Sequence, residues 1–402
     1  MLYRQEQYLK QIAEARKTAR IILIAGLHGS GRSSLLAETA RSIREERPPV
    51  RIVNAGRESG VTNAKELTQA ARALGVGPSA LFIDDADLIA PLAEAISAIL
   101  EKYSVTVFMT GRNTNRLEAA LAPTFGPAGL DCLAVIRLFP LTYGEFLAAT
   151  GITESRAALD LYCKTGGLPQ TLMVRPDSPS AAEFAKIRAN SFLLTEIVEE
   201  HAIRNPAHLR ALLELAARST GESLPARQVC AAFQADRITI SAQAVIDYLG
   251  FCAESGILAP VPTYDIVKRK FVDAANVWYF GDAGLRAAFS KRQSQADLAR
   301  AEENLAYLRL CADGWTVWRG KTGQSGTARE DISFVCEKGD RRIYIQMIAN
   351  AATQGARLRK RKALLAIRDA WPRYLIDADE SEEARDGIRM LYVREFLQTG
   401  IA

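Results

Sequence analysis

The sequence contains few of the residues that build metal centres and disulfide frameworks. Its three histidines and six cysteines are scattered, and no two cysteines form a CxxC pair. Isolated imidazoles argue against a zinc site, and single cysteines are typical of buried thiols in a reducing compartment. Apolar runs are also short, whereas a membrane span needs about 20 consecutive apolar residues. Because the first residues, MLYRQEQYLKQIAEARK, lack the apolar segment of a secretory signal, we expect a cytoplasmic protein with no membrane-inserted segment.

Composition and charge indicate a globular chain of several domains. Apolar residues make up 48% of the sequence and charged residues 24%, which are ordinary values for globular proteins. The net charge of +5 is mild, so it permits contact with nucleic acid without requiring it. A chain of 402 residues exceeds the size of one ordinary hydrophobic core. We therefore expect more than one domain.

Short apolar segments alternate with amphipathic segments over the first 145 residues. Strands are predicted at 21–26, 50–56, 80–87, 105–111 and 132–141, with helices between them. This alternation is typical of a parallel sheet with helices on both faces. Residues 1–145 are therefore predicted to form an α/β domain.

The remaining residues predict three further parts. Residues 146–204 are mostly helical and contain a GGLP turn, in which Gly166 and Gly167 are expected to end a helix with positive φ. Residues 205–295 predict three helices and a two-strand stretch, which is the winged-helix arrangement. Trp278, Tyr279 and Phe280 of that stretch are expected in the core. Residues 296–402 predict a small α/β domain with a very basic helix.

The stretch GLHGSGRSS after the first strand resembles the phosphate-binding loop G-x-x-x-x-G-K-[ST], with Arg32 at the lysine position. In such a loop, backbone N–H groups and the N-terminus of the following helix face the phosphates. Ser33 stands where a hydroxyl binds Mg²⁺, and Arg32 keeps the positive charge on a bulkier group. The residues expected around the phosphates of ATP are Gly26, His28, Gly29, Ser30, Gly31, Arg32, Ser33 and Ser34.

Polar side chains follow the two neighbouring strands of the predicted sheet. LFIDDAD places Asp84 where it would bind Mg²⁺ together with Ser33, and Asp85 where a glutamate commonly polarises the attacking water. VFMTGRNTNRL offers Asn113, and Thr110 as a second choice, to sense the γ-phosphate. Ligands bind at the carboxyl ends of parallel strands in such sheets. The sequence therefore predicts an ATP and Mg²⁺ site with Asp85 and Asn113 as catalytic residues.

With these motifs the chain resembles a family of predicted bacterial and archaeal ATPases of the AAA superfamily that carry a C-terminal domain of uncharacterised function. The resemblance also rests on YRQEQYLKQI near the N-terminus, RLFPLTYGEFL (137–147), YCKTGGLPQTL (162–172), AEENLAYLRL (301–310) and YIQMIA (344–349). It implies a P-loop NTPase core (1–145), a helical lid (146–204), a winged helix (205–295) and a domain similar to restriction endonucleases (296–402).

The chain departs from that family at a position important for hydrolysis. Family members often carry an arginine near position 130, where this chain has Leu130. An arginine finger, which neutralises charge on the transferring phosphoryl group, is therefore not evident. Arg112, Arg116 and Arg137 are the alternatives, and slow or partner-dependent turnover is expected.

The last domain lacks residues that a nuclease of the implied fold needs. Glu303, Asp331 and Gln346 are present, but Ser333 stands at a metal-binding aspartate position and Ile348 at the lysine position. The loss of a carboxylate and the lysine leaves too little charge to hold and use Mg²⁺. We expect a degenerate domain without nuclease activity.

Two basic segments offer a surface to a partner. The predicted wing carries Lys268, Arg269 and Lys270, and both it and the 357–373 segment could neutralise DNA phosphates. The segment's cations are Arg357, Arg359, Lys360, Arg361, Lys362, Arg368 and Arg373. The candidate recognition helix, SAQAVIDYLGFCAESG, has no arginine or lysine. It therefore lacks the side chains that most often contact base edges and phosphates.

Two functional hypotheses remain. One is a slow, Mg²⁺-dependent ATPase whose hydrolysis drives a domain rearrangement. The other is a non-hydrolysing, ATP-bound scaffold or a DNA-binding regulator, with an unknown protein as the alternative partner.

Overall fold

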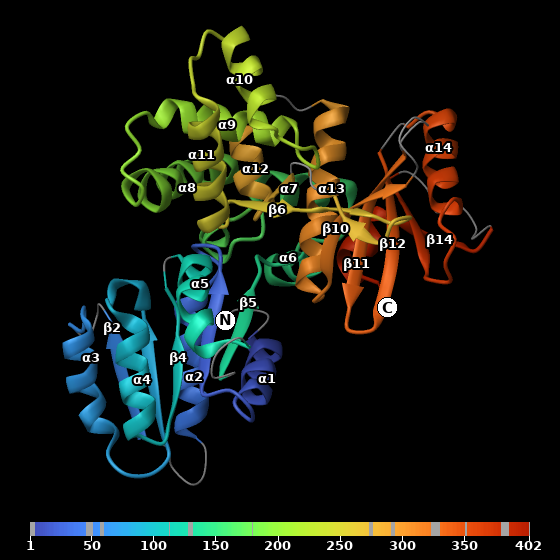
Figure 1. The fold of residues 1–402 in the computed structure, drawn as a ribbon. Helices are drawn as coiled ribbons and strands as arrows, with labels where there is room; N and C mark the ends of the chain where they lie inside the picture. Colours follow the sequence, from blue (N-terminus) through green and yellow to red (C-terminus); the bar gives the residue numbers. More distant parts are fainter. Residues whose placement is uncertain are drawn as a thin grey trace. The chain divides into compact units, whose positions relative to one another are not determined.

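The computed structural model describes residues 5–45, 51–56, 60–111, 113–127, 132–178, 180–272, 276–290, 294–322, 330–349, 352–378 and 386–401. The chain divides into two compact units, Met1–Phe139 with Glu254–Gly256, and Pro140–Ala253 with Ile257–Ala402 (Figure 1). In the part of the chain that is described, no helix has the length and apolar character needed to cross a bilayer. The four-part division expected from the sequence stays a prediction.

The first unit is built on a parallel sheet of five strands in the order β2-β3-β4-β1-β5. The strands are β1 (Ile21–Gly26), β2 (Arg51–Gly56), β3 (Ser79–Asp84), β4 (Val105–Met109) and β5 (Leu133–Leu138). Four lie within the segments predicted from their apolar runs, and β3 begins one residue before its predicted segment. The α/β fold class is therefore confirmed.

Helices cover both faces of this sheet, as the alternation of side chains along each strand requires. Ile22 and Ile24 pack on the face covered by α1 (Gln5–Ala15) and α2 (Arg32–Arg44). Ile21 and Leu23 pack on the opposite face. That face is covered by α3 (Ala64–Ala70), η2 (Ala71–Leu74), η3 (Ala86–Leu88), α4 (Leu92–Lys102) and α5 (Thr114–Phe125). Because both faces are buried, the strands contain few polar residues.

The second unit contains the remaining helices and two sheets. Its helices begin with α6 (Tyr143–Thr150), α7 (Arg156–Thr165), η4 (Pro169–Met173), α8 (Ala181–Phe192) and the π-helix η5 (Leu193–Glu199). They continue with α9 (Pro206–Arg218), α10 (Ala226–Ala235), α11 (Ala242–Glu254), α12 (Ala283–Phe289), α13 (Gln295–Ala312), α14 (Gln354–Leu365) and α15 (Val393–Thr399). The last of these helices was not predicted from the sequence.

The larger sheet of this unit has seven strands in the order β14-β13-β12-β11-β10-β7-β8. They are β14 (Ile388–Tyr392), β13 (Arg373–Asp377), β12 (Arg341–Ile348), β11 (Glu330–Lys338), β10 (Thr316–Thr322), β7 (Thr263–Asp265) and β8 (Lys270–Phe271). One face packs against α13 and α15 through residues such as Leu305 and Phe396. The other packs against α14 through Ala363 and Leu364.

The two-strand stretch predicted around 258–280 is wrong in one respect, because it forms four strands. β6 (Leu258–Val261) pairs with β9 (Val277–Phe280), whereas β7 runs parallel to β10 in the larger sheet. Pro262 lies between β6 and β7 and has no N–H with which to continue the first ladder. Its carbonyl oxygen instead accepts the N–H of Arg319 at 3.0 Å. The chain therefore changes partner strand at this proline.

The GGLP turn is held by a buried carboxylate. Gly166 ends α7 with φ 75°, as expected, but Gly167 does not have a positive φ. A Cβ at Gly167 would overlap the carbonyl oxygen of Leu141, so that position needs glycine for space. Asp282, 1% exposed, accepts the N–H of Gly167 at 2.8 Å and of Leu285 at 3.0 Å. Leu141 in turn donates its N–H to Gly167 at 2.7 Å.

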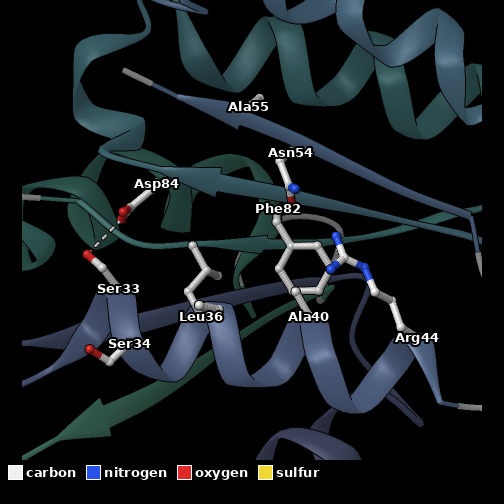
Figure 2. A pocket seen from close by; sticks show the side chains of 10 residues that line it. Ser33, Ser34, Leu36, Ala40, Arg44, Asn54, Ala55, Phe82 and Asp84 are labelled. Carbon is white, nitrogen blue, oxygen red and sulfur yellow. Dashed lines mark hydrogen bonds between the residues drawn. The ribbon is translucent and has the colours of Figure 1, made fainter. Parts of the chain in front are cut away.

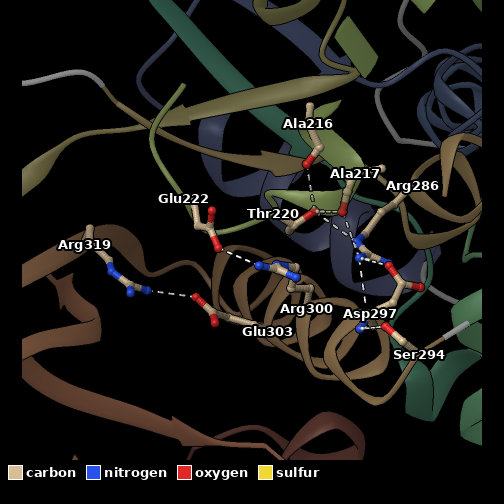
Figure 3. A network of polar contacts seen from close by, with 10 residues as sticks. All are labelled: Ala216, Ala217, Thr220, Glu222, Arg286, Ser294, Asp297, Arg300, Glu303 and Arg319. Carbon is tan, nitrogen blue, oxygen red and sulfur yellow. Dashed lines mark hydrogen bonds and ion pairs between the residues drawn. The ribbon is translucent and has the colours of Figure 1, made fainter. Parts of the chain in front are cut away.

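The aromatic run of β9 is confirmed as core, with Trp278 7% exposed and Tyr279 and Phe280 fully buried. A polar network joins α9, α12 and α13 (Figure 3). In it, Arg286 on α12, 2% exposed, donates to Thr220 at 3.0 Å and to Asp297 on α13 at 2.7 Å. The predicted winged-helix segment is therefore tied to α13 by hydrogen bonds as well as by packing.

Candidate nucleotide-binding site

The loop after β1 is shaped by its glycines. Gly29 and Gly31 have φ of 83° and 98°, a region that residues with a Cβ rarely adopt. Gly31 is also the N-cap residue of α2, so the loop opens directly onto the helix N-terminus. At Gly26 a Cβ would overlap the carbonyl oxygen of Leu138. The loop therefore has the close turns and the helix start that phosphate binding requires.

The two predicted Mg²⁺ ligands lie side by side. Ser33, in the first turn of α2, donates its hydroxyl to Asp84 Oδ1 at the end of β3, at 3.1 Å (Figure 2). Both oxygens are ligands that Mg²⁺ prefers, and Mg²⁺ at phosphate sites takes few protein ligands. No group of three or more metal-binding side chains occurs among the described residues. The pair therefore fits a Mg²⁺ ion whose remaining ligands are phosphate oxygens and water.

Asp85 and Thr110 lie where β3 and β4 end. Asp85 has φ 53° and is the N-cap residue of η3, and aspartate is among the residues that tolerate this left-handed conformation. The N–H of Ala86 donates to the carbonyl of Thr110 at 2.8 Å, and Thr110 donates to Ile83 at 3.0 Å. These bonds extend the strand pairing, so the backbone of the Asp85 turn is fixed to the neighbouring strand.

Asn113 is the N-cap residue of α5, and its side chain is only partly satisfied. Its Oδ1 accepts the N–H of Arg116 at 3.1 Å, and the residue is 8% exposed. Its Nδ2 is buried without a hydrogen-bond partner among the described residues, as is Ser30 Oγ in the loop. A buried polar atom without a partner is costly and rare. Either atom would be satisfied by a hydrogen-bond partner brought to it.

Thr114 is a site residue that the sequence reasoning missed. Its hydroxyl, 4% exposed, accepts the N–H of Gly26 at 3.0 Å and donates to the carbonyl of Gly26 at 3.3 Å. It thus connects the start of α5 to the first glycine of the loop. The only signal in the sequence was its place next to Asn113 in GRNTN.

The remaining predicted residues have varied surroundings. Arg32 is buried at 8% exposure, His28 and Gly29 are half-buried, and Ser34 is exposed. Of the alternatives to an arginine finger, Arg137 forms an ion pair with Glu118 at 2.7 Å. Arg112 and Leu130 lie outside the described residues. Arg137 is therefore already neutralised within its own unit.

A pocket of about 500 Å³ begins at the Ser33–Asp84 pair and follows α2. Phe82 of β3 and Asn54 of β2 line it opposite the helix. Arg44, at its far end, extends toward Phe82 (Figure 2). The Ser33–Asp84 pair is therefore open to a ligand from this side.

Three comparisons with known proteins are informative. A model of a domain of unknown function, DUF8612, matches residues 156–296. An uncharacterized protein of Haemophilus influenzae is 23% identical over 407 residues, covering 98% of this chain and 98% of that protein. Among solved structures, the Walker-type ATPase PABY2304 of Pyrococcus abyssi is similar, with a TM-score of 0.51 and 13% identity, covering 72% of this chain and 96% of that one. The chain therefore has the fold of a Walker-type P-loop ATPase.

Proposed function

We propose that this protein binds Mg²⁺–ATP and hydrolyses it slowly, with hydrolysis driving a rearrangement of its domains. The observation that carries the proposal is the hydrogen bond of 3.1 Å between Ser33 and Asp84, beside a glycine-shaped loop. In this proposal the loop amides and Arg32 hold the phosphates, and Ser33 and Asp84 hold Mg²⁺. Bound Mg²⁺ supplies positive charge that stabilises the transferring phosphoryl group.

Two further side chains are assigned to the chemical step. Asp85 orients the attacking water, and the Nδ2 group of Asn113 donates to the γ-phosphate. The support for Asn113 is its buried amide without a partner among the described residues. Slow turnover follows because arginine replaces the lysine of the loop and Asp85 is one methylene shorter than glutamate.

The test is ATP binding and steady-state turnover of the wild type beside Arg32→Lys and Asp85→Asn. We expect Asp85→Asn to retain affinity for Mg²⁺–ATP and lose turnover, and Arg32→Lys to raise turnover. A wild type that binds ATP without turnover, and an Asp85→Asn variant indistinguishable from it, would favour the non-hydrolysing scaffold. Failure to bind Mg²⁺–ATP at all would contradict both the ATPase and the ATP-bound scaffold.

We further propose that α9, α10, α11, β6 and β9 form a winged helix, and that DNA is the partner. The basic segment of 357–373 contributes less than its charge count suggests. Arg357 pairs with Asp377 and Arg361 with Asp386, while Lys360 and Arg373 donate to backbone carbonyls. The cations left exposed are Arg359, Lys362 and Arg368.

The last domain is proposed to be nuclease-like in fold but without nuclease activity. Glu303 accepts hydrogen bonds from Tyr279 at 2.8 Å and Arg319 at 2.9 Å, so its carboxylate is already neutralised. Ser333 donates its hydroxyl to Gln346 at 2.8 Å. Contacts of this kind support a structural role for these side chains in place of metal binding.

A further inference from the structure

One face of the seven-stranded sheet carries a row of aromatic rings beside α14. Trp318 of β10, Tyr264 of β7 and Phe271 of β8 are neighbours, with ring centroids 5.6 Å apart for Tyr264–Trp318 and 5.3 Å for Phe271–Trp318. Tyr264 belongs to the hydrophobic cluster that packs under α14, and Trp318 packs against it. Phe271 is 51% exposed and Trp318 is half-buried. This part of the sheet therefore presents flat apolar rings to solvent.

Three cations stand at the turn between β7 and β8. The side chains of Lys268, Arg269 and Lys270 are exposed, and in the described part of the chain they make no hydrogen bond or ion pair. The turn itself is fixed, because the buried Asp265 accepts the N–H of Lys268 at 2.8 Å and Arg269 has φ 52°. Residues 266–272 include no acid. The turn therefore presents its positive charge next to the exposed ring of Phe271.

On the sheet side of the row, Arg342 lies over the ring of Tyr264, 5.0 Å from its centroid. Its charge is balanced by Glu337, to which it donates at 2.6 Å. The exposed cations at one end of the aromatic row, Lys268, Arg269 and Lys270, form no ion pair within the described part of the chain.

We propose that this aromatic and basic surface binds single-stranded nucleic acid. Phosphates contact Lys268, Arg269 and Lys270, and an unpaired base stacks on Phe271. Cations that neutralise a backbone next to exposed rings that stack bases are the combination that single strands require. A duplex keeps its bases stacked and offers only phosphates to such a surface. The inference rests on the proposed nucleic-acid partner and narrows it to unpaired strands.

The surface of α11 also favours single-stranded nucleic acid over duplex DNA as the ligand. Helix α11 is the candidate recognition helix for duplex DNA, yet it has no cation, and it exposes Asp247 and Ile246, the latter at 54%. A negative and apolar helix surface does not suit a DNA major groove. Three consecutive exposed cations, Lys268, Arg269 and Lys270, lie on the β7–β8 turn instead.

Fluorescence anisotropy of the full chain with a labelled oligothymidine of about 20 nucleotides tests the inference. Changing Lys268, Arg269 and Lys270 together to alanine is expected to weaken binding at least tenfold. It should also lower the slope of log affinity against log salt by about 2, since each single-strand phosphate contact contributes about 0.7. Phe271→Ala is expected to weaken binding to the oligothymidine about tenfold, the typical loss for one stacked base, and to leave duplex binding unchanged.

The matched control changes Lys10, Lys65 and Arg72 to alanine, which removes the same charge from exposed side chains of the first unit. It should alter affinity less than twofold, and circular dichroism and Mg²⁺–ATP binding should stay unchanged in every variant. Equal loss from both triple variants, or no binding by the wild type at low salt, overturns the inference. Binding of duplex alone overturns it and leaves the proposed DNA partner standing. Competition by polyglutamate or phosphatidylserine vesicles as strong as that by DNA would identify an acidic protein or a membrane instead.

Discussion

The observed task of Asn113 is to cap α5, and its proposed task is to donate to the γ-phosphate. Its oxygen caps α5, and its amide nitrogen is buried without a partner among the described residues. Aspartate caps a helix as well as asparagine does but has no amide donor. The two tasks can therefore be separated by substitution.

We expect Asn113→Asp to retain stability and to lower ATP turnover about 100-fold, the usual cost of one missing donor to a developing charge. Asn113→Ala should lose turnover and, in addition, about 1 kcal/mol of unfolding free energy, because the cap is lost as well. Urea unfolding and steady-state turnover measure the two effects. Equal turnover in Asn113→Asp and the wild type would show that the amide only fills space.

At the same scale, the sequence predicted residue types better than their contacts. Ser33 and Asp84 are in different motifs, and the spacing of loop and strand was enough to anticipate that they meet. The contact between Thr114 and Gly26 was missed because nothing in the sequence pairs residues 88 positions apart. For the same reason the cations of the basic helix were expected to be unpaired. The fold alone brings Asp377 to Arg357 and the carbonyl of Met347 to Lys360.

Among the elements, the turn that follows α7 depends on Asp282 of the distant helix α12. Burial raises the pKa of this carboxyl above 3.8, and hydrogen bonds from backbone N–H groups oppose the rise only in part. A raised carboxyl pKa means that the folded protein holds this proton at pH values where the unfolded chain has released it. The contribution of Asp282 to stability is therefore greatest at low pH and falls as the pH rises.

We expect the unfolding free energy of the wild type, relative to Asp282→Asn, to decrease as the pH rises from 3.8 through the raised pKa and then to stay constant. Urea unfolding of the two proteins at a series of pH values checks this. A relative stability that increases with pH would mean that the backbone hydrogen bonds to Asp282 outweigh its burial.

Strand assignments differed in how well the sequence predicted them. β1, β3 and β4 were predictable because strands buried on both faces are continuous apolar runs. β13, β14 and α15 were missed, and RYLID of β13 is a short apolar run with a charged residue at each end. The division of the 258–280 stretch between two sheets was also missed, because a proline marks an interruption without telling which strand the chain joins next.

On the scale of the whole molecule, one buried cluster of the second unit includes residues from several of its predicted parts. Tyr143 and Phe146 of α6, Tyr279 of β9, Leu305 of α13 and Phe334 of β11 belong to the same buried cluster. The sequence predicted lid, winged helix and terminal domain as successive parts. Because residues from these parts are buried in the same cluster, unfolding one part is expected to destabilise the others.

Cleavage at a protease site engineered between residues 290 and 294 should therefore leave the two pieces together. The pieces are expected to co-elute in size-exclusion chromatography and to separate only in denaturant, because β7 and β10 lie on opposite sides of the cut. The uncut protein carrying the same site is the control. Separation of the pieces in native buffer would contradict a common core.

The change of partner strand at Pro262 has a mechanical consequence. A wing that ended in a free hairpin would move independently of everything downstream, whereas here the hairpin is continuous with the sheet through β10. Pro262 separates β7 from β6, so a load applied at the β7–β8 turn acts on the larger sheet and, through one residue, on the β6–β9 pair.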